Sequence, residues 1–302
     1  MQSDSPIVLA VGATGKFARL IVPELVRRNA KVRALVRNPS EGDKALSLGA
    51  TEFAVGDLRD ADSLTRALDG VNGVFHIGPA FAPDEAAMGV TLIEAAEEAG
   101  VRKFVFSSVI QPTNTRLENH ASKIPVENAL YSSRLEYTIL HPANFMQNIG
   151  MSWPIILESG SFSEPFPREA KVARVDYRDV AELAAIALTS DRLAYATLEL
   201  CAGMFDRYEI AAIMSDELGR TIEASELSFS EWVASARLPY GDRELQLLAK
   251  VHEHYRKYGL GGNSLALAAA LGRNPRSLRQ YISELVRGQA SAASTREEAK
   301  HG

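Results

Sequence analysis

Short apolar runs alternate with amphipathic segments along residues 6–142. The apolar runs are rich in Val, Ile, Leu and Phe, and they predict buried strands at 6–11, 31–36, 51–55, 72–77, 102–107 and 136–141. Apolar positions at helical spacing lie between these runs and predict helices at 17–28, 60–68, 84–99 and 122–133. Repeated strand–helix units of this composition indicate an α/β fold with a doubly wound parallel sheet, in which ligands bind beyond the carboxyl ends of the strands.

The alternation ends near residue 145. Pro154, Pro165 and Pro167 indicate a loop-rich passage, after which a helix capped by Asp176 or Asp179 runs to Leu188. A strand near 197–201 is expected to return to the sheet, and later apolar spacing predicts helices at 208–218, 230–236, 241–258, 264–271 and 275–287. The chain therefore divides into a sheet domain at 1–150, a smaller and mostly helical C-terminal lobe at 151–288 that returns to the sheet near 175–201, and a tail at 289–302 that is expected to be disordered because it lacks an apolar face.

Composition narrows the class of protein. The 302 residues are 46% hydrophobic and carry a formal net charge of −5, which argues against a dedicated nucleic-acid binder. Because a membrane span needs about 18–20 apolar residues, and no run approaches that length, we expect a cytoplasmic protein without a membrane partner. Cys201 is the single cysteine, and His252 and His254 are two apart on a predicted helix, so neither an internal disulfide nor a metal site is expected.

The stretch from Ile7 to Ala18 carries the strongest chemical signal. An apolar strand leads into a turn with Gly12 and Gly15, and a helix pattern follows. Gly12 permits a sharp exit from the strand, and Gly15 lets backbone approach a pyrophosphate at a helix N-terminus, where free N–H groups favour anions. Ala18 stands where a small residue is needed for close packing between helix and strand. This order predicts a Rossmann-type dinucleotide-binding domain.

The end of the second predicted strand indicates which dinucleotide binds. NAD-selective folds place an acid there to bind the ribose 2′-hydroxyl, whereas this chain has Arg37. A guanidinium can bind a 2′-phosphate in a forked geometry, and Lys16 adds a second positive charge, so NADP (NADPH) is favoured over NAD. The alternative is that Arg37 is a solvated residue at a strand end. Asp57 follows the third strand and either accepts from the adenine amino group or caps the next helix.

Several motifs resemble the NmrA-like family, an atypical group of the extended short-chain dehydrogenase/reductase superfamily. The segments that carry this resemblance are Val11–Gly15, Leu35–Arg37, Gly56–Leu58, Thr138–Asn148, Tyr255–Leu260 and Leu271–Pro275. The resemblance covers residues 6–287, and Thr138–Asn148 is its most specific part. It implies a bound dinucleotide, usually NADP. It also implies one of two roles, because some members are NAD(P)H-dependent reductases and others are redox sensors that regulate partner proteins.

The predicted cofactor contacts lie in the loops that follow the strands. They are Gly12, Thr14, Gly15, Lys16, Phe17, Arg37, Asp57, Leu58, Ile77, Gly78, Lys123, Pro142, Asn144 and Phe145. By the resemblance, Lys123 matches the lysine near the nicotinamide ribose. The superfamily's Tyr-x-x-x-Lys pair is incomplete here, because Asn119 stands four residues before Lys123.

Three residues are candidates for the catalytic work. They are Lys123, His120 and Ser108. His120 lies three residues before Lys123, a spacing that places two side chains on one helix face, so it is either the acid or a surface histidine near a helix start. Ser107 and Ser108 follow the fifth strand at the usual place of the superfamily's catalytic serine, where either hydroxyl binds a substrate oxygen or the pair turns the chain.

The leading hypothesis is an NADPH-dependent reductase of a small apolar carbonyl, quinone or activated alkene. One alternative is an NADP(H)-sensing regulatory protein that binds a protein partner and has little or no catalytic activity. A weaker alternative is an isomerase or dehydratase that uses the cofactor transiently. The sequence leaves the oligomeric state open.

Overall fold

The chain forms two compact units. The computed structural model describes residues 5–236 and 238–301, with side chains as far as residue 289. Unit 1 contains the chain up to Pro142, Tyr177–Leu200 and Ala266–Arg273, and unit 2 contains Ala143–Asp176, Cys201–Leu265 and the chain from Asn274 on. The chain therefore leaves the sheet at 142 rather than at the expected residue 150. Its return at 177–200 lies where the sequence places one, whereas the return at 266–273 has no counterpart in the sequence analysis.

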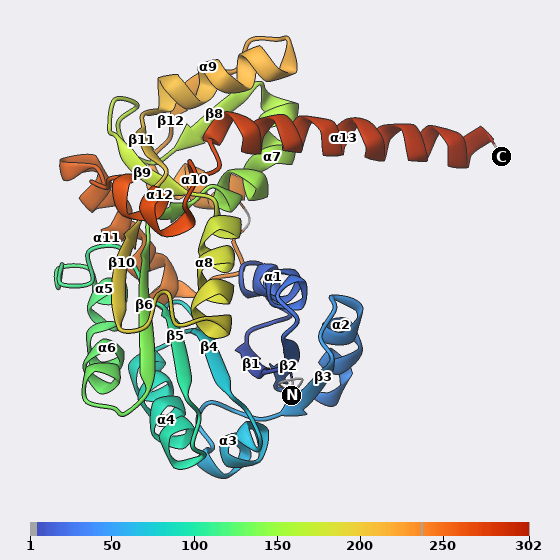
Figure 1. Cartoon of the computed structure of the whole chain (residues 1–302). Helices are drawn as coiled ribbons and strands as arrows, with labels where there is room; N and C mark the ends of the chain where they lie inside the picture. The colour runs from blue at the N-terminus through green and yellow to red at the C-terminus, as the bar shows by residue number, and fades with distance from the viewer. Residues whose placement is uncertain (1–4, 237, 302) are drawn as a thin grey trace. The chain divides into compact units, whose positions relative to one another are not determined.

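Unit 1 is built on a parallel sheet of seven strands in the order β10-β6-β5-β4-β1-β2-β3 (Figure 1). The predicted doubly wound α/β fold is confirmed, and each strand begins and ends within one residue of its predicted limits. The strands are β1 (Ile7–Val11), β2 (Lys31–Val36), β3 (Glu52–Val55), β4 (Gly73–Ile77), β5 (Lys103–Ser107), β6 (Glu136–Pro142) and β10 (Ala196–Leu200). The strand order reverses between β1 and β4, which is where such sheets bind ligands.

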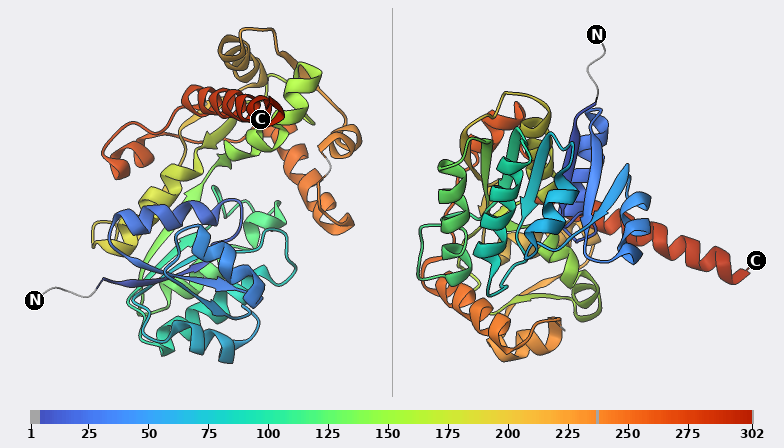
Figure 2. Two further views of the ribbon diagram at one scale, coloured as in Figure 1. Left: turned by 90° about the vertical axis from the view of Figure 1, so that its right-hand side faces the viewer. Right: turned by 90° about the horizontal axis from the view of Figure 1, so that it is seen from below.

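Helices cover both faces of this sheet (Figures 1 and 2). One face packs against α3, α4 and α6 through apolar side chains that include Leu64, Leu92 and Leu130, and the other packs against α8. The helices of this unit are η1 (Ala18–Leu20), α1 (Ile21–Arg27), η2 (Pro39–Glu41), α2 (Gly42–Ser47), α3 (Ala61–Leu68), α4 (Glu85–Glu98), α5 (Glu118–Ala121), α6 (Ile124–Tyr131), α8 (Tyr177–Thr189) and α12 (Leu265–Leu271). No helix among the described residues is long and apolar enough to cross a membrane.

Unit 2 contains two small sheets and five helices within its described residues. The strands are β7 (Asn144–Phe145), β8 (Ser161–Glu164), β9 (Val172–Val175), β11 (Gly203–Phe205) and β12 (Glu223–Glu226). The helices are α7 (Gln147–Ser159), α9 (Arg207–Leu218), α10 (Phe229–Ala236), α11 (Asp242–Tyr258) and α13 (Leu278–His301). The passage after residue 145 is thus not mainly loop. Pro154 lies inside α7, where buried Ile149, Trp153 and Ile156 share one helix face and offset the lost backbone hydrogen bond.

The last helix extends through the segment predicted to be disordered. The structure continues α13 through residues 289–301, while Gly302 lies outside the described residues. The composition of this segment accounts for the difference, because Ala, Glu, Lys and Arg favour a helix even where no apolar face is available to pack.

Truncation after Gly288 is expected to leave the melting temperature and NADPH affinity nearly unchanged, because the removed segment lacks an apolar stripe. Differential scanning calorimetry and titration calorimetry on the full and truncated chains measure both quantities. A loss of several degrees in melting temperature would show that the segment docks.

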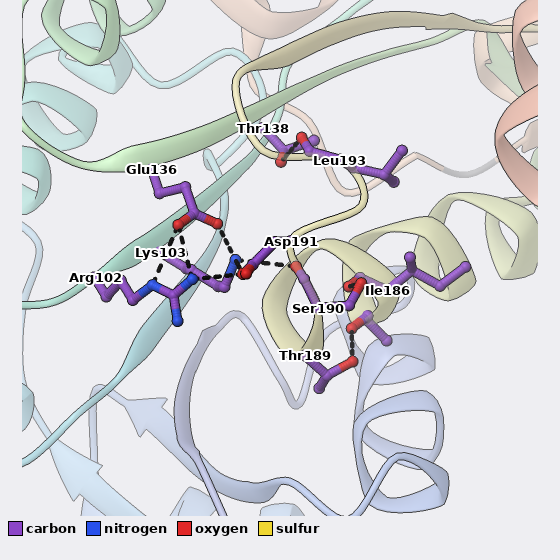
Figure 3. Close-up of polar contacts among 10 residues, drawn as sticks. Arg102, Lys103, Glu136, Thr138, Ile186, Thr189, Ser190, Asp191 and Leu193 are labelled. Carbon is purple, nitrogen blue, oxygen red and sulfur yellow. Dashed lines mark hydrogen bonds and ion pairs between the residues drawn. The ribbon is translucent and has the colours of Figure 1, made fainter.

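A charged cluster holds the amino-terminal edge of the sheet (Figure 3). The ammonium of Lys103, at the start of β5, is paired with Glu136 and with Asp191, and its Nζ donates to the Ser190 carbonyl at 2.9 Å. Arg102 binds the same two carboxylates. These contacts tie the end of α8 to β5 and β6. They lie at the strand ends opposite to those that bind ligands, so we assign them to stability.

Candidate functional site

The turn after β1 contains two glycines whose backbone geometry suits glycine. Gly12 has a φ of 73°, in the left-handed region that favours glycine, and its carbonyl accepts the Gly15 N–H at 2.8 Å. A Cβ on Gly15 would lie 3.0 Å from the Gly12 oxygen, and one on Gly12 would lie 3.5 Å from the Ala18 Cβ. Backbone can therefore come close to a bound group here, directly before the helical turn of η1.

The other residues of this turn are more open. Lys16 is exposed, and Thr14 and Phe17 are half-buried. The Phe17 ring packs on Tyr177 at the start of α8, with 5.6 Å between ring centroids. The positive charge of Lys16 and the backbone N–H groups of this turn thus lie together at the start of a helix. This is the arrangement that binds an anionic pyrophosphate.

Arg37 follows β2 with its side chain exposed to solvent. Among the residues that the structure describes, its guanidinium has no hydrogen bond or ion pair. Only its backbone N–H is used, donating to the Glu41 carboxylate at 3.3 Å. The guanidinium is therefore available for an external anion.

Two acidic residues in the loop after β3, Asp57 and Asp60, have different roles. Asp60 caps α3 by accepting from the Ser63 N–H at 3.3 Å, so capping is not the role of Asp57. Asp57 is exposed and accepts from the Arg59 N–H at 2.9 Å, which leaves carboxylate lone pairs available. Leu58 is half-buried against the apolar core.

The end of β4 lies against a buried ion pair. A Cβ on Gly78, the residue after Ile77, would collide with the Glu85 carboxylate. That carboxylate pairs with the Lys123 ammonium and also accepts from the Ser122 hydroxyl at 3.1 Å. Glu85 is 3% exposed and Lys123 is 8% exposed. The sequence analysis missed Glu85, which stands 38 residues before its partner.

His120 and Lys123 do not lie on one continuous helix. His120 belongs to α5, and Lys123 lies directly before α6 in a turn where its N–H donates to the His120 carbonyl at 3.0 Å. The imidazole of His120 is 3% exposed, and its Nδ1 lies 3.3 Å from the Gln111 carbonyl oxygen. The surface position considered for His120 is therefore wrong, because this residue of the short helix α5 is buried.

Two serines at the end of β5 have different partners. Ser107 accepts from the Tyr177 hydroxyl at 3.0 Å. Ser108 donates to Glu127 of α6 at 2.5 Å, and the same oxygen lies 2.9 Å from Nε2 of His141 on β6. The sequence analysis missed Tyr177, Glu127 and His141. Of these three, Glu127 could have been found from the sequence, because it stands four residues after Lys123, a spacing that places two side chains on the same side of a helix.

Burial keeps two further groups uncharged. The pKa of His76 is lowered to about 3 by burial and secondarily by the positive charge of Lys123, and neither ring nitrogen has a hydrogen-bond partner among the described residues. Burial also raises the pKa of Tyr177, although its bond to Ser107 acts in the opposite direction. Tyr177 is thus a poor substitute for the acidic tyrosine that the superfamily uses.

The remaining predicted contacts fall on both sides of the unit boundary. Pro142 ends β6 in unit 1, and its carbonyl accepts the Ile110 N–H at 2.9 Å. Asn144 and Phe145 form β7 in unit 2, where the Asn144 amide oxygen accepts from Arg174 at 3.2 Å. Unit 1 alone therefore brings together the glycine turn, Arg37, Asp57 and the polar groups after β4 and β5. Among the described residues, no group of three or more His, Cys, Asp and Glu side chains could hold a metal ion.

Comparison with known proteins gives consistent matches. The model of the NmrA-like family matches residues 4–282. The NAD(P)H azoreductase of Xenophilus azovorans is 33% identical over 72% of this chain and 75% of that protein. The structure of an Escherichia coli NADPH-dependent quinone oxidoreductase complexed with NADPH is similar with a TM-score of 0.79 at 25% identity, over 92% of this chain and 99% of that one. NmrA, a negative transcriptional regulator in complex with NADP, shares the fold with a TM-score of 0.78 at 16% identity, over 96% of this chain and 98% of its own.

Proposed function

The chain belongs to the NmrA-like family, as its motifs predict, and from this premise we propose that it is an NADPH-dependent reductase. Its acceptor is a small apolar carbonyl, quinone or activated alkene. The azoreductase and the quinone oxidoreductase among its relatives support both the cofactor and the reaction. We further propose that it works in the cytoplasm on a small-molecule substrate.

One observation carries the choice of cofactor. The glycine turn admits the backbone approach that a dinucleotide needs, and the exposed guanidinium of Arg37 stands at the end of the neighbouring strand. The residues present therefore fit NADPH, since an unpaired guanidinium suits a 2′-phosphate.

The remaining contacts follow the order of the strands. Gly12, Thr14, Gly15, Lys16 and Phe17 would hold the pyrophosphate, and Asp57 and Leu58 the adenine, while Ile77, Gly78, Lys123 and Pro142 of unit 1 would contact the nicotinamide end. When bound, the reduced nicotinamide supplies the hydride.

Lys123 acts as a fixed positive charge in this proposal. An ammonium has three hydrogens, so the pair with Glu85 leaves donors for the ribose hydroxyls or for an acceptor oxygen. Glu85 holds the flexible lysine side chain in place. A positioned charge of this kind stabilises the negative charge that develops on the acceptor.

A second function is favoured by the incomplete catalytic pair. Asn119 replaces the tyrosine four residues before Lys123, and Tyr177 is buried with a raised pKa. A sensor that binds NADP(H) and regulates a protein partner needs no acid.

The two functions separate in one experiment. The purified protein is incubated with NADPH and a panel of quinones, azo dyes and enones, while loss of NADPH absorbance is followed and binding is measured by calorimetry. A reductase consumes NADPH only when an acceptor is present. Tight NADPH binding without consumption across the panel would support the sensor.

A further inference from the structure

We propose that Ser108, Glu127 and His141 form a proton relay that protonates the acceptor, with Ser108 as the catalytic residue that touches it. This inference rests on the proposed reductase function. It identifies a source for the proton that the superfamily's catalytic tyrosine, replaced here by Asn119, would otherwise supply. The sequence analysis did not group these three residues, because they come from separate elements. Ser108 directly follows β5, Glu127 lies on α6 and His141 lies on β6.

The three side chains meet at one carboxylate oxygen. The Ser108 Oγ lies 2.5 Å from Glu127 Oε1, and the His141 Nε2 lies 2.9 Å from the same atom. Ser108 is 7% exposed, and the Glu127 and His141 side chains are 9% and 15% exposed. A chain of short contacts thus runs from an enclosed hydroxyl to the group with the best access to water.

The strands place this chain at the ligand-binding edge. Ser107 is the register partner of Leu140, and the Ser108 N–H donates to the Leu140 carbonyl at 2.9 Å, so Ser108 lies beside His141 at the carboxyl ends of β5 and β6. Lys123 lies one helical turn before Glu127, whose N–H donates to the Lys123 carbonyl at 3.0 Å. The fixed charge and the relay therefore belong to one corner of unit 1.

The proton balance is complete with these residues and water. When the acceptor carbon gains the hydride, the π bond of its C=O group breaks, and that electron pair leaves the oxygen negatively charged. The Ser108 O–H bond breaks as a new O–H bond forms on the acceptor, and Oγ takes a proton from Glu127. Glu127 receives that proton from the His141 imidazolium and turns its O–H about the C–O bond. Neutral His141 then takes a proton from water, which leaves as hydroxide, so each turnover consumes one proton from solvent.

Other acids in unit 1 suit this task less well. His76 is fully buried, and its lowered pKa of about 3 keeps it neutral. His120 is held against the Gln111 carbonyl, and Tyr177 has a pKa raised by burial. Ser108 is the hydroxyl at this edge whose partner leads on to a titratable group with solvent access.

Several charged groups face His141 from the elements packed around it. Glu127 comes from α6, and Glu199 is the register partner of His141 on β10, so its side chain points to the same face of the sheet. Lys123 lies before α6 and is already paired with Glu85. Because the relay takes its proton from solvent, the rate should fall as the pH rises.

The test uses Ser108→Ala, Glu127→Gln and His141→Gln. The glutamine at 141 keeps a donor for Glu127 but cannot carry a proton. Tyr131→Phe is the matched control, since its hydroxyl contacts Thr197 at 3.2 Å on the same side of α6 outside the relay. Each is assayed with 1,4-naphthoquinone and with 2,3-dichloro-1,4-naphthoquinone, whose reduced form is the weaker base and needs an acid less.

Removal of a general acid costs about 10²–10⁴-fold in rate. The relay variants are expected to lose at least about 10²-fold with naphthoquinone and much less with the dichloro compound. His141→Gln should also remove the decline of the wild-type rate at high pH, whereas Tyr131→Phe should match the wild type. NADPH affinity and melting temperature show that each variant is folded, and His141→Gln keeps the test decisive if Glu127→Gln does not fold.

Equal losses with both quinones and an unchanged pH profile would overturn the relay and leave the three residues a structural role. A wild-type protein that reduces no acceptor would instead overturn the proposed function, and the relay with it. The wild-type control therefore separates the two failures.

Discussion

Lys123→Met is expected to lower turnover by about 10²–10³-fold, the loss seen when one positioned electrostatic donor is removed. Methionine keeps most of the packing of the lysine stem, so NADPH affinity should fall only modestly. Steady-state rates of NADPH consumption and calorimetric binding constants separate the two effects. A variant that reduces its acceptor at the wild-type rate would show that Lys123 is not catalytic.

The structure shows that Lys123→Met should also lower the stability of the fold, which the sequence does not show. Lys123→Met leaves the Glu85 carboxylate buried without its partner, which destabilises a protein by roughly 3–5 kcal/mol. The matched control is the double variant Lys123→Met/Glu85→Gln, which removes the stranded charge. Denaturant unfolding should show most of the lost stability restored in the double variant, while turnover stays low. Restored turnover would mean that the single variant failed through folding alone.

Arg37→Ala is expected to weaken NADPH binding by roughly 2–3 kcal/mol, or about 30- to 150-fold, with NADH binding almost unchanged. The guanidinium is exposed and, among the described residues, has no partner, so its removal breaks no internal contact. The full effect should therefore appear in cofactor binding. Titration calorimetry with both cofactors measures it.

Arg66→Ala is the matched control for Arg37. Arg66 is also exposed, but it lies in the last turn of α3, at the opposite end of the sheet from Arg37. Its loss should leave both affinities unchanged. Equal weakening of NADPH and NADH by Arg37→Ala would contradict recognition of the 2′-phosphate.

Much of unit 1 could be predicted from the sequence because its central strands β1, β4 and β5 are buried on both faces. Such strands form continuous apolar runs, and glycine or polar residues mark where they end. The run at 6–11, for example, corresponds to β1 (Ile7–Val11). The carboxyl ends of the strands then fix which loops gather at the ligand-binding edge.

Unit 2 was harder to predict because its elements are short or contain an atypical residue. β7 has two residues and β11 has three, too few to show an alternating pattern. Pro154 indicates a loop by its local preference, but the buried face of α7 holds the helix together.

The partners of the site residues could not be predicted because they come from distant parts of the chain. Glu85 on α4 binds Lys123, and Tyr177 on α8 donates to Ser107, which stands 70 positions earlier in the chain. A spacing rule within one helix also misplaced His120, since it could not show that α5 ends after four residues. Sequence patterns fix local structure, whereas these contacts depend on how helices pack on the sheet.

The most direct measurement of the central claim is transfer of label from cofactor to product. NADPH deuterated stereospecifically at one face of nicotinamide C4 is incubated with the protein and an enone that it reduces, whose new C–H bond at the β-carbon does not exchange with water, and the product is analysed by mass spectrometry. An NADPH-dependent reductase should deliver one deuterium per product molecule from one face and none from the other. Saturable NADPH binding with no deuterium in any product from either face would contradict the reductase function.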